Sequence, residues 1–207
     1  MGGNQLDKIE QNFYKRDTIE VAKELLGKYI VVNEKNEKIV AKIVEVEAYL
    51  GINDKAAHSY GGRKTERTRV MYEDGGCVYI FQIYGMYNCL NIVTSHKEIP
   101  EAVLIRAVEP ISNIDKFSFN RFKKSFNELT RYQQKNITNG PGKLCMAMNI
   151  TKELNGEDLS SDKMYILDNK EDFEIISSKR IGIDYAEEAK DYLLRFYIKD
   201  NKYVSKK

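Results

Sequence analysis

Two glutamates, Glu45 and Glu47, are the first side chains in this sequence whose type and spacing could do chemistry. They lie in the run 43–50, whose β-branched residues predict a strand. Alternate side chains of a strand point to one face, so both glutamates share a face with Tyr49 and with the apolar residues Ile39, Ala41 and Ile43. A carboxylate carried toward a core costs free energy unless it is paired, hydrogen-bonded or facing a wet cleft. The pattern fits a catalytic carboxylate, a metal ligand or the exposed end of a strand, and spacing alone does not choose among them.

A basic, glycine-containing segment, 53–69, follows this strand. Glycine lets backbone amides approach a phosphate closely, and arginine binds phosphate oxygens through paired N–H groups. A solvated charged loop would have the same composition, so the segment becomes specific only in combination with other features. Its candidate residues are His58, Gly61, Gly62, Arg63, Lys64, Thr65, Arg67, Thr68 and Arg69.

Aromatic residues mark the next pair of predicted strands, 77–84 and 87–94, which Gly85-Met86 joins as a tight hairpin. Tyr79 and Phe81 share a face of the first strand, and core packing accounts for them. Core packing does not account for Tyr84 and Tyr87, two large rings that flank the tip of the hairpin.

Two further sites of positive charge follow. Arg106 interrupts an apolar strand predicted over 102–108, and if buried it needs an anion or a carboxylate such as Glu45 or Glu47. Gly140-Pro141-Gly142 introduces a short helix predicted over 143–148, whose N-terminal amides could hold a phosphate.

Two motif matches fail on inspection. His96-Lys97-Glu98 has the H-x-E of zinc deaminases, but no P-C-x-x-C follows it. Gly140 to Lys143 resembles the end of a phosphate-binding P-loop, yet the earlier glycine is missing and Leu144 replaces the required Ser or Thr. The sequence therefore implies no metal and no cofactor.

The elements that must position these residues fit one domain. The chain has 207 residues and a net charge of +2, with 33 Lys and Arg against 31 Asp and Glu, so whole-chain charge neither requires nor excludes an anionic partner. We expect a single domain over 1–207, frayed at 1–5 and 204–207. A helix ending at Gly27, strands at 29–32 and 38–49 joined by a turn at 33–37, a mostly helical stretch at 114–132, and strands at 164–168, 173–177 and 193–199 complete the predicted elements.

The three cysteines are scattered and form no C-x-x-C pair, and no apolar run approaches the roughly 18–20 residues that span a membrane. These features predict a reducing, cytoplasmic compartment and no membrane partner.

Several blocks in the same order give the sequence a family resemblance. They are V-E-V-E-A-Y-L-G at 44–51, A-A-H-S at 56–59, G-G-R-K-T at 61–65, Y-G-M-Y-N-C-L-N at 84–91, L-I-R-A-V-E-P at 104–110, G-P-G-K-L-C at 140–145 and L-R-F-Y-I at 194–198. Together they resemble the alkyladenine, or 3-methyladenine, DNA glycosylases of the type shared by bacteria and mammals, over most of the chain. The resemblance implies an α+β fold, a single mixed domain in which a curved antiparallel β-sheet has flanking helices and a protruding β-hairpin that intercalates into DNA.

The resemblance also implies roles for individual residues. Glu47 is the expected general base that activates water and Arg106 helps to hold that water, with Glu45 in support. The expected base-binding residues are Tyr49, His58, Phe81 and Asn91, the intercalating residue is Tyr84, and the DNA-backbone contacts are Arg63, Thr65, Arg67 and Lys143. The best-known mammalian relatives have Tyr at the Phe81 position, so the stacking face is kept here and the hydroxyl is lost.

The implied function is base-excision repair. The enzyme would flip alkylated or deaminated purines (3-methyladenine, 7-methylguanine, hypoxanthine or ethenoadenine) out of double-stranded DNA and hydrolyse the glycosidic bond to leave an abasic site. We expect a monomer, associated with the bacterial nucleoid through DNA. The alternative is a non-catalytic binder of distorted DNA, against which Glu47 argues, because a pure binder has no reason to direct a carboxylate at a polyanion.

Overall fold

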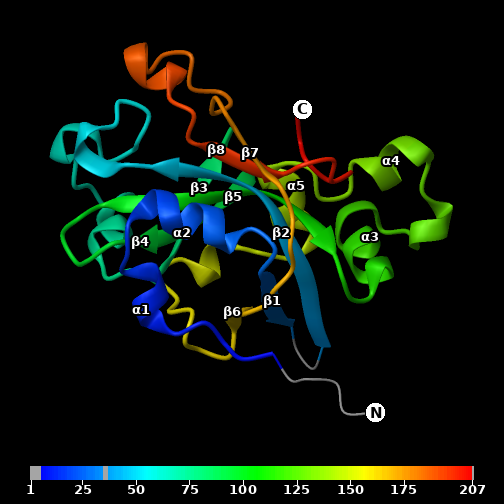
Figure 1. Cartoon of the computed structure of the whole chain (residues 1–207). Coiled ribbons are helices and arrows are strands. Elements are labelled where there is room, and N and C mark those ends of the chain that lie inside the picture. Colours follow the sequence, from blue (N-terminus) through cyan, green and yellow to red (C-terminus); the bar gives the residue numbers. More distant parts are fainter. Residues whose placement is uncertain (1–5, 35–36, 207) are drawn as a thin grey trace.

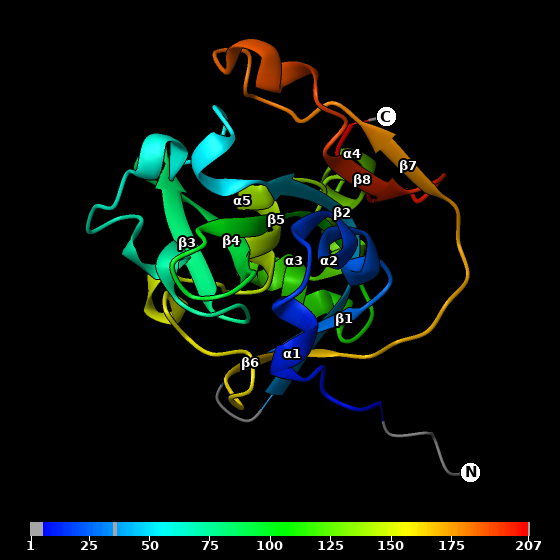
Figure 2. The ribbon, with the colours of Figure 1, turned by 60° about the vertical axis from the view of Figure 1, so that its left-hand side comes forward.

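The computed structural model describes residues 6–34 and 37–206. Its described strands form one eight-stranded sheet in the order β3-β4-β5-β2-β1-β6, with β8 also paired to β2 and β7 to β8. These strand pairs are antiparallel. The sheet is strongly curved, and helices pack against it (Figures 1 and 2). The predicted fold class, an α+β domain built on a curved antiparallel sheet with flanking helices, is confirmed. The strands are β1 (Tyr29–Glu34), β2 (Glu37–Tyr49), β3 (Val78–Ile83), β4 (Tyr87–Thr94), β5 (Glu101–Pro110), β6 (Met164–Leu167), β7 (Ile175–Ser178) and β8 (Arg195–Ile198).

Strand β2 is the centre of this sheet. It pairs with β5 along one edge, and along its other edge with β1 in its first half and with β8 at Glu45, Val46 and Glu47. The β2–β5 register is irregular at Glu45 but is the same on both sides of it, since Ile43 lies opposite Val108 and Val46 opposite Ile105. The predicted alternation is therefore kept along the strand, and Glu45 and Glu47 stay in phase with the apolar residues before them.

Helices cover both faces of the sheet. Helix α2 (Thr18–Leu25) begins at Asp17, whose carboxylate accepts hydrogen bonds from the amides of Ile19 and Glu20. It packs against β2 and β5, while α5 (Pro141–Ala147) packs against β4 and β5, with α3 (Ile114–Phe122) beside it (Figures 1 and 2). The remaining helices are α1 (Gln11–Tyr14), α4 (Arg131–Lys135) and short 3-10 turns at Gly51–Asn53, Tyr60–Gly62, Arg69–Tyr72, Phe126–Glu128, Lys152–Leu154 and Glu187–Asp191.

The aromatic hairpin differs from the prediction at its tip. Ile83 pairs with Tyr87, so the connection has three residues, Tyr84, Gly85 and Met86, rather than the two expected. Tyr84 and Gly85 both have positive φ, 52° and 69°, which the tight reversal requires. Tyr84 therefore leaves the strand and stands at the tip, 88% exposed.

Three other expectations need correction. The stretch 114–132 is not one helical run, because Lys123 adopts a left-handed conformation that ends α3. Helix α5 begins at Pro141, two residues earlier than expected, since proline suits a first helical position. The predicted fraying at 204–207 is wrong for 204–206, where Val204 is buried and Ser205 is hydrogen-bonded; Lys207 and residues 1–5 lie outside the described residues. No helix in the described part of the chain is long and apolar enough to cross a membrane.

Candidate active site

Three charged side chains meet in the middle of the sheet. Glu45 and Glu47 are each 0% exposed, and Arg106 from the neighbouring strand β5 is 7% exposed. Arg106 Nε donates to Glu45 Oε1 at 3.1 Å, and its Nη1 lies 3.2 Å from Glu47 Oε1. The prediction that Arg106 pairs with one of these carboxylates is confirmed, and in fact the guanidinium bridges both of them.

Glu47 has two further hydrogen bonds. The Tyr49 hydroxyl donates to Oε2 at 2.8 Å, and the Ile181 amide donates to Oε1 at 2.7 Å. Burial raises the pKa of Glu47 above its ordinary value of 4.5, and Arg106, Ile181 and Tyr49 offset only part of this shift. The carboxylate is thus held in one orientation yet keeps more affinity for a proton than a carboxylate in water.

Glu45 is held more completely. Its Oε1 accepts from Arg106, from Arg195 Nη1 at 2.9 Å and from the Ser205 hydroxyl at 2.9 Å, and its Oε2 accepts from the Ser205 amide at 2.6 Å. Among the described residues, Glu45 thus accepts four hydrogen bonds, whereas Glu47 has three polar contacts. Glu45 therefore suits a supporting role, and Glu47 is the better candidate for chemistry.

A cavity of about 260 Å³ lies in front of this network. The predicted base-binding residues Tyr49, His58, Phe81 and Asn91 all line it, as do Tyr84 and Arg106. The structure thus brings together side chains from a strand, a loop and the hairpin that are far apart in sequence. The cavity's volume lies just below the roughly 300–1,000 Å³ of drug-sized ligand pockets, which suits one ring system such as a base.

Two aromatic side chains of the cavity lining, His58 and Phe81, pack against each other, and the His58 imidazole is neutral. The rings of His58 and Phe81 meet edge to face with centroids 4.4 Å apart. Burial lowers the pKa of His58 to about 4, with Arg67 and Arg63 contributing, so the imidazole is neutral at pH 7. Arg67 Nη2 lies 3.4 Å from Nε2, which makes Nε2 the acceptor and leaves Nδ1–H to donate to the Tyr79 hydroxyl at 3.0 Å.

The predicted backbone-binding residues fall into two places. Arg63, Thr65 and Arg67 line a second recess that adjoins the cavity and shares His58 with it. Lys143 is not among the residues that line either hollow; it lies on α5, half-buried, and donates to Asn136 and Asn139 at 2.9 Å each.

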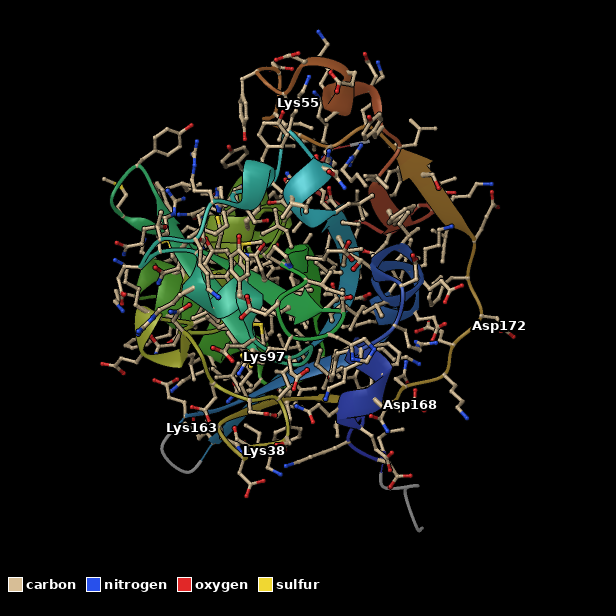
Figure 3. All side chains as sticks on the ribbon, turned by 90° about the vertical axis from the view of Figure 1, so that its left-hand side faces the viewer. Lys38, Lys55, Lys97, Lys163, Asp168 and Asp172 are labelled. Atoms are coloured by element: carbon tan, nitrogen blue, oxygen red, sulfur yellow. The ribbon has the colours of Figure 1, made fainter. Side chains whose placement is uncertain are left out.

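Lys55 also lines the recess. It pairs with Glu187 at 2.7 Å and Glu188 at 2.9 Å, and this joins the basic loop to the segment 187–191. Figure 3 shows Lys55 pointing toward that segment, at the end of the molecule opposite Lys38 and Lys163.

Sequence reasoning missed several residues of the network. Arg195 lies opposite Glu47 in the β2–β8 pairing, and its charge within an apolar strand was an available signal. Ser205 was assigned to a frayed tail. Ile181 contributes only its amide, which no side-chain pattern could reveal. The loop carrying it is fixed by Arg180, which donates to Asp54 at 2.9 Å and lies 4.7 Å from the Tyr49 ring centre. Over 6–34 and 37–206, no three His, Cys, Asp or Glu side chains gather as ligands for a metal.

Comparisons with known proteins agree with this geometry. A family model described as methylpurine-DNA glycosylase matches residues 12–202. A protein of Clostridium novyi (strain NT) is 76% identical over 202 residues, which cover 98% of this chain and 100% of the relative. A protein of Clostridium acetobutylicum is 59% identical over 199 residues, covering 96% and 97% of the two chains. One of Clostridium perfringens (strain 13) is 53% identical over 204 residues, covering 97% and 100%.

Each of these relatives is named "Putative 3-methyladenine DNA glycosylase". The family match spans both carboxylates, the aromatic hairpin and all of the described cavity lining, and the relatives match over nearly their whole length. The chain belongs to the methylpurine-DNA glycosylase family, and it is a DNA glycosylase of DNA repair.

Proposed function

We propose that this enzyme hydrolyses the N-glycosidic bond of a damaged purine after flipping it out of duplex DNA, with Glu47 as the general base. The observation that carries the proposal is the placement of a fully buried carboxylate, hydrogen-bonded to Tyr49 and bridged by Arg106, directly behind an aromatic cavity. Glu47's partners Tyr49, Arg106 and Ile181 all line that cavity, so a reacting group bound there would meet them first.

The shape of the molecule supports the proposed base flipping. A glycosidic bond inside a stacked duplex is out of reach, so the nucleotide must leave the helix and another group must fill the gap. Tyr84 stands at the hairpin tip with 88% of its surface exposed, and it also borders the cavity. It is therefore placed to occupy the vacated stack while the base enters beside it. Arg63, Thr65 and Arg67 would bind the backbone next to the flipped nucleotide, and Lys143 would contact it on the α5 side.

The proposed reaction needs only water and the protein. Glu47 removes a proton from a water molecule that Arg106 helps to orient, and the water oxygen forms a bond to the C1′ carbon of the sugar. The bond from C1′ to the base breaks and its electron pair leaves with the base. Among the described residues, none of those that line the cavity is a lysine, so none of them offers an amine to attack the sugar. We therefore expect a monofunctional enzyme that leaves an abasic site and an unbroken strand.

The cavity favours a range of purines rather than one. Cationic bases such as 3-methyladenine and 7-methylguanine stack well on the electron-rich faces of Tyr49 and Phe81, and their glycosidic bonds are already weakened. Neutral lesions such as hypoxanthine and ethenoadenine gain less from stacking and depend more on polar contacts, for which His58 and Asn91 are placed. Since one chain supplies all of these groups, we expect the enzyme to act as a monomer.

The test is the Glu47→Gln variant, with Glu24→Gln as a matched control on the exposed side of α2. Base release is measured in single turnover on duplexes that each carry one of the four lesions, and binding is measured on the same duplexes. Loss of a general base costs roughly 10²- to 10⁴-fold in rate, while lesion binding stays near that of the parent. Near-normal excision by Glu47→Gln would remove Glu47 from this role. Strand scission before alkali treatment, or a borohydride-trapped adduct, would contradict the monofunctional assignment.

A further inference from the structure

The last described residues of the chain reach the Glu45 carboxylate. After β8 the chain turns back, and Figure 2 shows the C-terminal end lying beside β7 and β8. Val204 is buried, and Ser205 binds both oxygens of Glu45, its amide to Oε2 at 2.6 Å and its hydroxyl to Oε1 at 2.9 Å. The Lys206 carbonyl accepts a hydrogen bond from Arg195 Nη1 at 2.8 Å. The tail is thus anchored to the network rather than lying loosely on the surface.

These contacts continue to the proposed general base. Ser205 and Arg195 hold Glu45, Glu45 receives the Nε–H of Arg106, and Arg106 presents Nη1 to Glu47 at 3.2 Å. Within the described chain, the Ser205 amide is the single hydrogen-bond donor to Glu45 Oε2. Removal of both Ser205 donors, the amide and the hydroxyl, would leave Glu45 Oε2 buried without a partner. The Glu45 carboxylate would then be free to turn away from Arg106.

We propose that Ser205 is a positioning residue of the glycosylase reaction: it fixes the Glu45 carboxylate, which in turn fixes the Arg106 guanidinium against Glu47. This inference rests on the proposed role of Glu47 as general base. It assigns a function in catalysis to the described tail residues 204–206, none of which lines the cavity.

If Arg106 is held less firmly against Glu47, the pH dependence of the reaction should change, whereas a simple loss of packing would lower the rate equally at every pH. Burial raises the pKa of Glu47, and Arg106 is the largest influence that lowers it, larger than the opposing repulsion from Glu45. An Arg106 side chain that is less firmly held therefore lets the pKa of Glu47 rise further. The titratable and charged groups that face Glu47 from the packed elements are Glu45, Tyr49, Cys89, Arg106, Arg180 and Arg195.

The experiment compares three substitutions at one position. Ser205→Ala removes the hydroxyl donor, Ser205→Pro removes both donors, and Ser205→Thr keeps both. Lys206→Ala is the matched control, because the backbone carbonyl that binds Arg195 is retained. Single-turnover excision of 3-methyladenine from a duplex is measured from about pH 4 to about pH 9, together with duplex binding, because the raised pKa of Glu47 places the acidic limb of the pH–rate profile above 4.5.

We expect Ser205→Ala to lose roughly 10-fold in rate on the acidic limb, the equivalent of one hydrogen bond to a charged group. The acidic limb of the pH–rate profile should move to higher pH. The excision rate should fall less at alkaline pH, and duplex binding should be unchanged. Ser205→Pro should show a larger shift in the same direction. Ser205→Thr and Lys206→Ala should reproduce the parent profile.

Two results would overturn the inference: profiles of Ser205→Ala that match the parent, or a loss of rate that is equal at every pH. If Ser205→Pro does not fold, the comparison of Ser205→Ala with Ser205→Thr decides the question. The Glu47→Gln variant separates the two proposals. Full activity of Glu47→Gln refutes the proposed function, whereas an inactive Glu47→Gln beside Ser205 variants with parental profiles refutes only the role of Ser205.

Discussion

Replacement of Arg106 by Met tests how far the site depends on one bridging guanidinium. The substitution keeps most of the side-chain bulk but removes the charge and the donors that reach Glu45 at 3.1 Å and Glu47 at 3.2 Å. Breaking a buried ion pair by removing one partner typically costs about 3–5 kcal/mol. For a chain of this size, about 2–4 °C in melting temperature per kcal/mol converts that loss to a decrease of about 6–20 °C.

The loss of stability should depend on pH in a definite direction. Arg106 lowers the pKa of Glu47, so its removal raises this pKa further above the ordinary value of 4.5. Between 4.5 and the raised pKa, the folded variant holds a proton that the unfolded chain has released, so the stability of the variant relative to the parent falls as the pH rises through this interval and is lowest above the raised pKa. As the pH falls through the raised pKa toward 4.5, Glu47 becomes protonated and part of the difference disappears.

Thermal unfolding of parent and variant across this pH range measures the effect. Arg16→Met is the matched control, because Arg16 pairs with Glu24 at 2.8 Å on the surface, with side chains 38% and 51% exposed. An exposed pair contributes about 0–1 kcal/mol, so the control should lose at most a few degrees at any pH. An Arg106→Met variant that loses no more than Arg16→Met, or loses the same amount at every pH, would refute this account of the site.

Three further outcomes are expected. Tyr84→Ala should weaken excision of well-paired lesions more than of mismatched ones, because the few kcal/mol of unstacking is no longer offset by a side chain in the gap; equal excision of both kinds of duplex would show that Tyr84 does not intercalate. Phe81→Tyr should change excision of neutral lesions more than of cationic ones, and competition between hypoxanthine and 3-methyladenine duplexes would measure it. Arg67→Gln should raise the pKa of His58 above about 4, since one of the nearby cations that lower it is removed, and an NMR titration of the imidazole would report the change.

The sequence predicted the parts of the site that depend on a local pattern, either alternation along a strand or a charge within an apolar run. Alternation along 39–49 placed Glu45 and Glu47 on one face, because the β2–β5 pairing holds the same register on both sides of its irregularity. The ion pair of Arg106 was predicted for a different reason: its charge lies within an apolar strand, and a buried guanidinium requires a carboxylate or another anion. Family blocks then assigned roles that spacing could not.

The parts that were missed depend on backbone geometry or on distant contacts. The third residue in the hairpin loop follows from positive φ at Tyr84, which is unusual for a tyrosine and which no neighbouring residue indicates. The tail was expected to fray because Lys206 and Lys207 are charged, and its buried contacts are made by Val204 and by one small hydroxyl residue.

The separation of these contacts along the chain explains why the site could be predicted only in part, and it also bears on how the site forms. Hydrogen bonds to the two glutamates come from residues 61, 134, 150 and 160 positions away. Each such contact closes a long loop, whose entropy cost grows only slowly with length, so no single closure is prohibitive. Tyr49, which lies on β2 itself, can donate to Glu47 at once. The other donors reach the two carboxylates only after β5, β8, the loop at Ile181 and the tail have docked on β2, and until then water must take their place. Burial of Glu47, and with it the raised pKa that suits a base, is therefore a property of the completed sheet rather than of the strand that carries the residue.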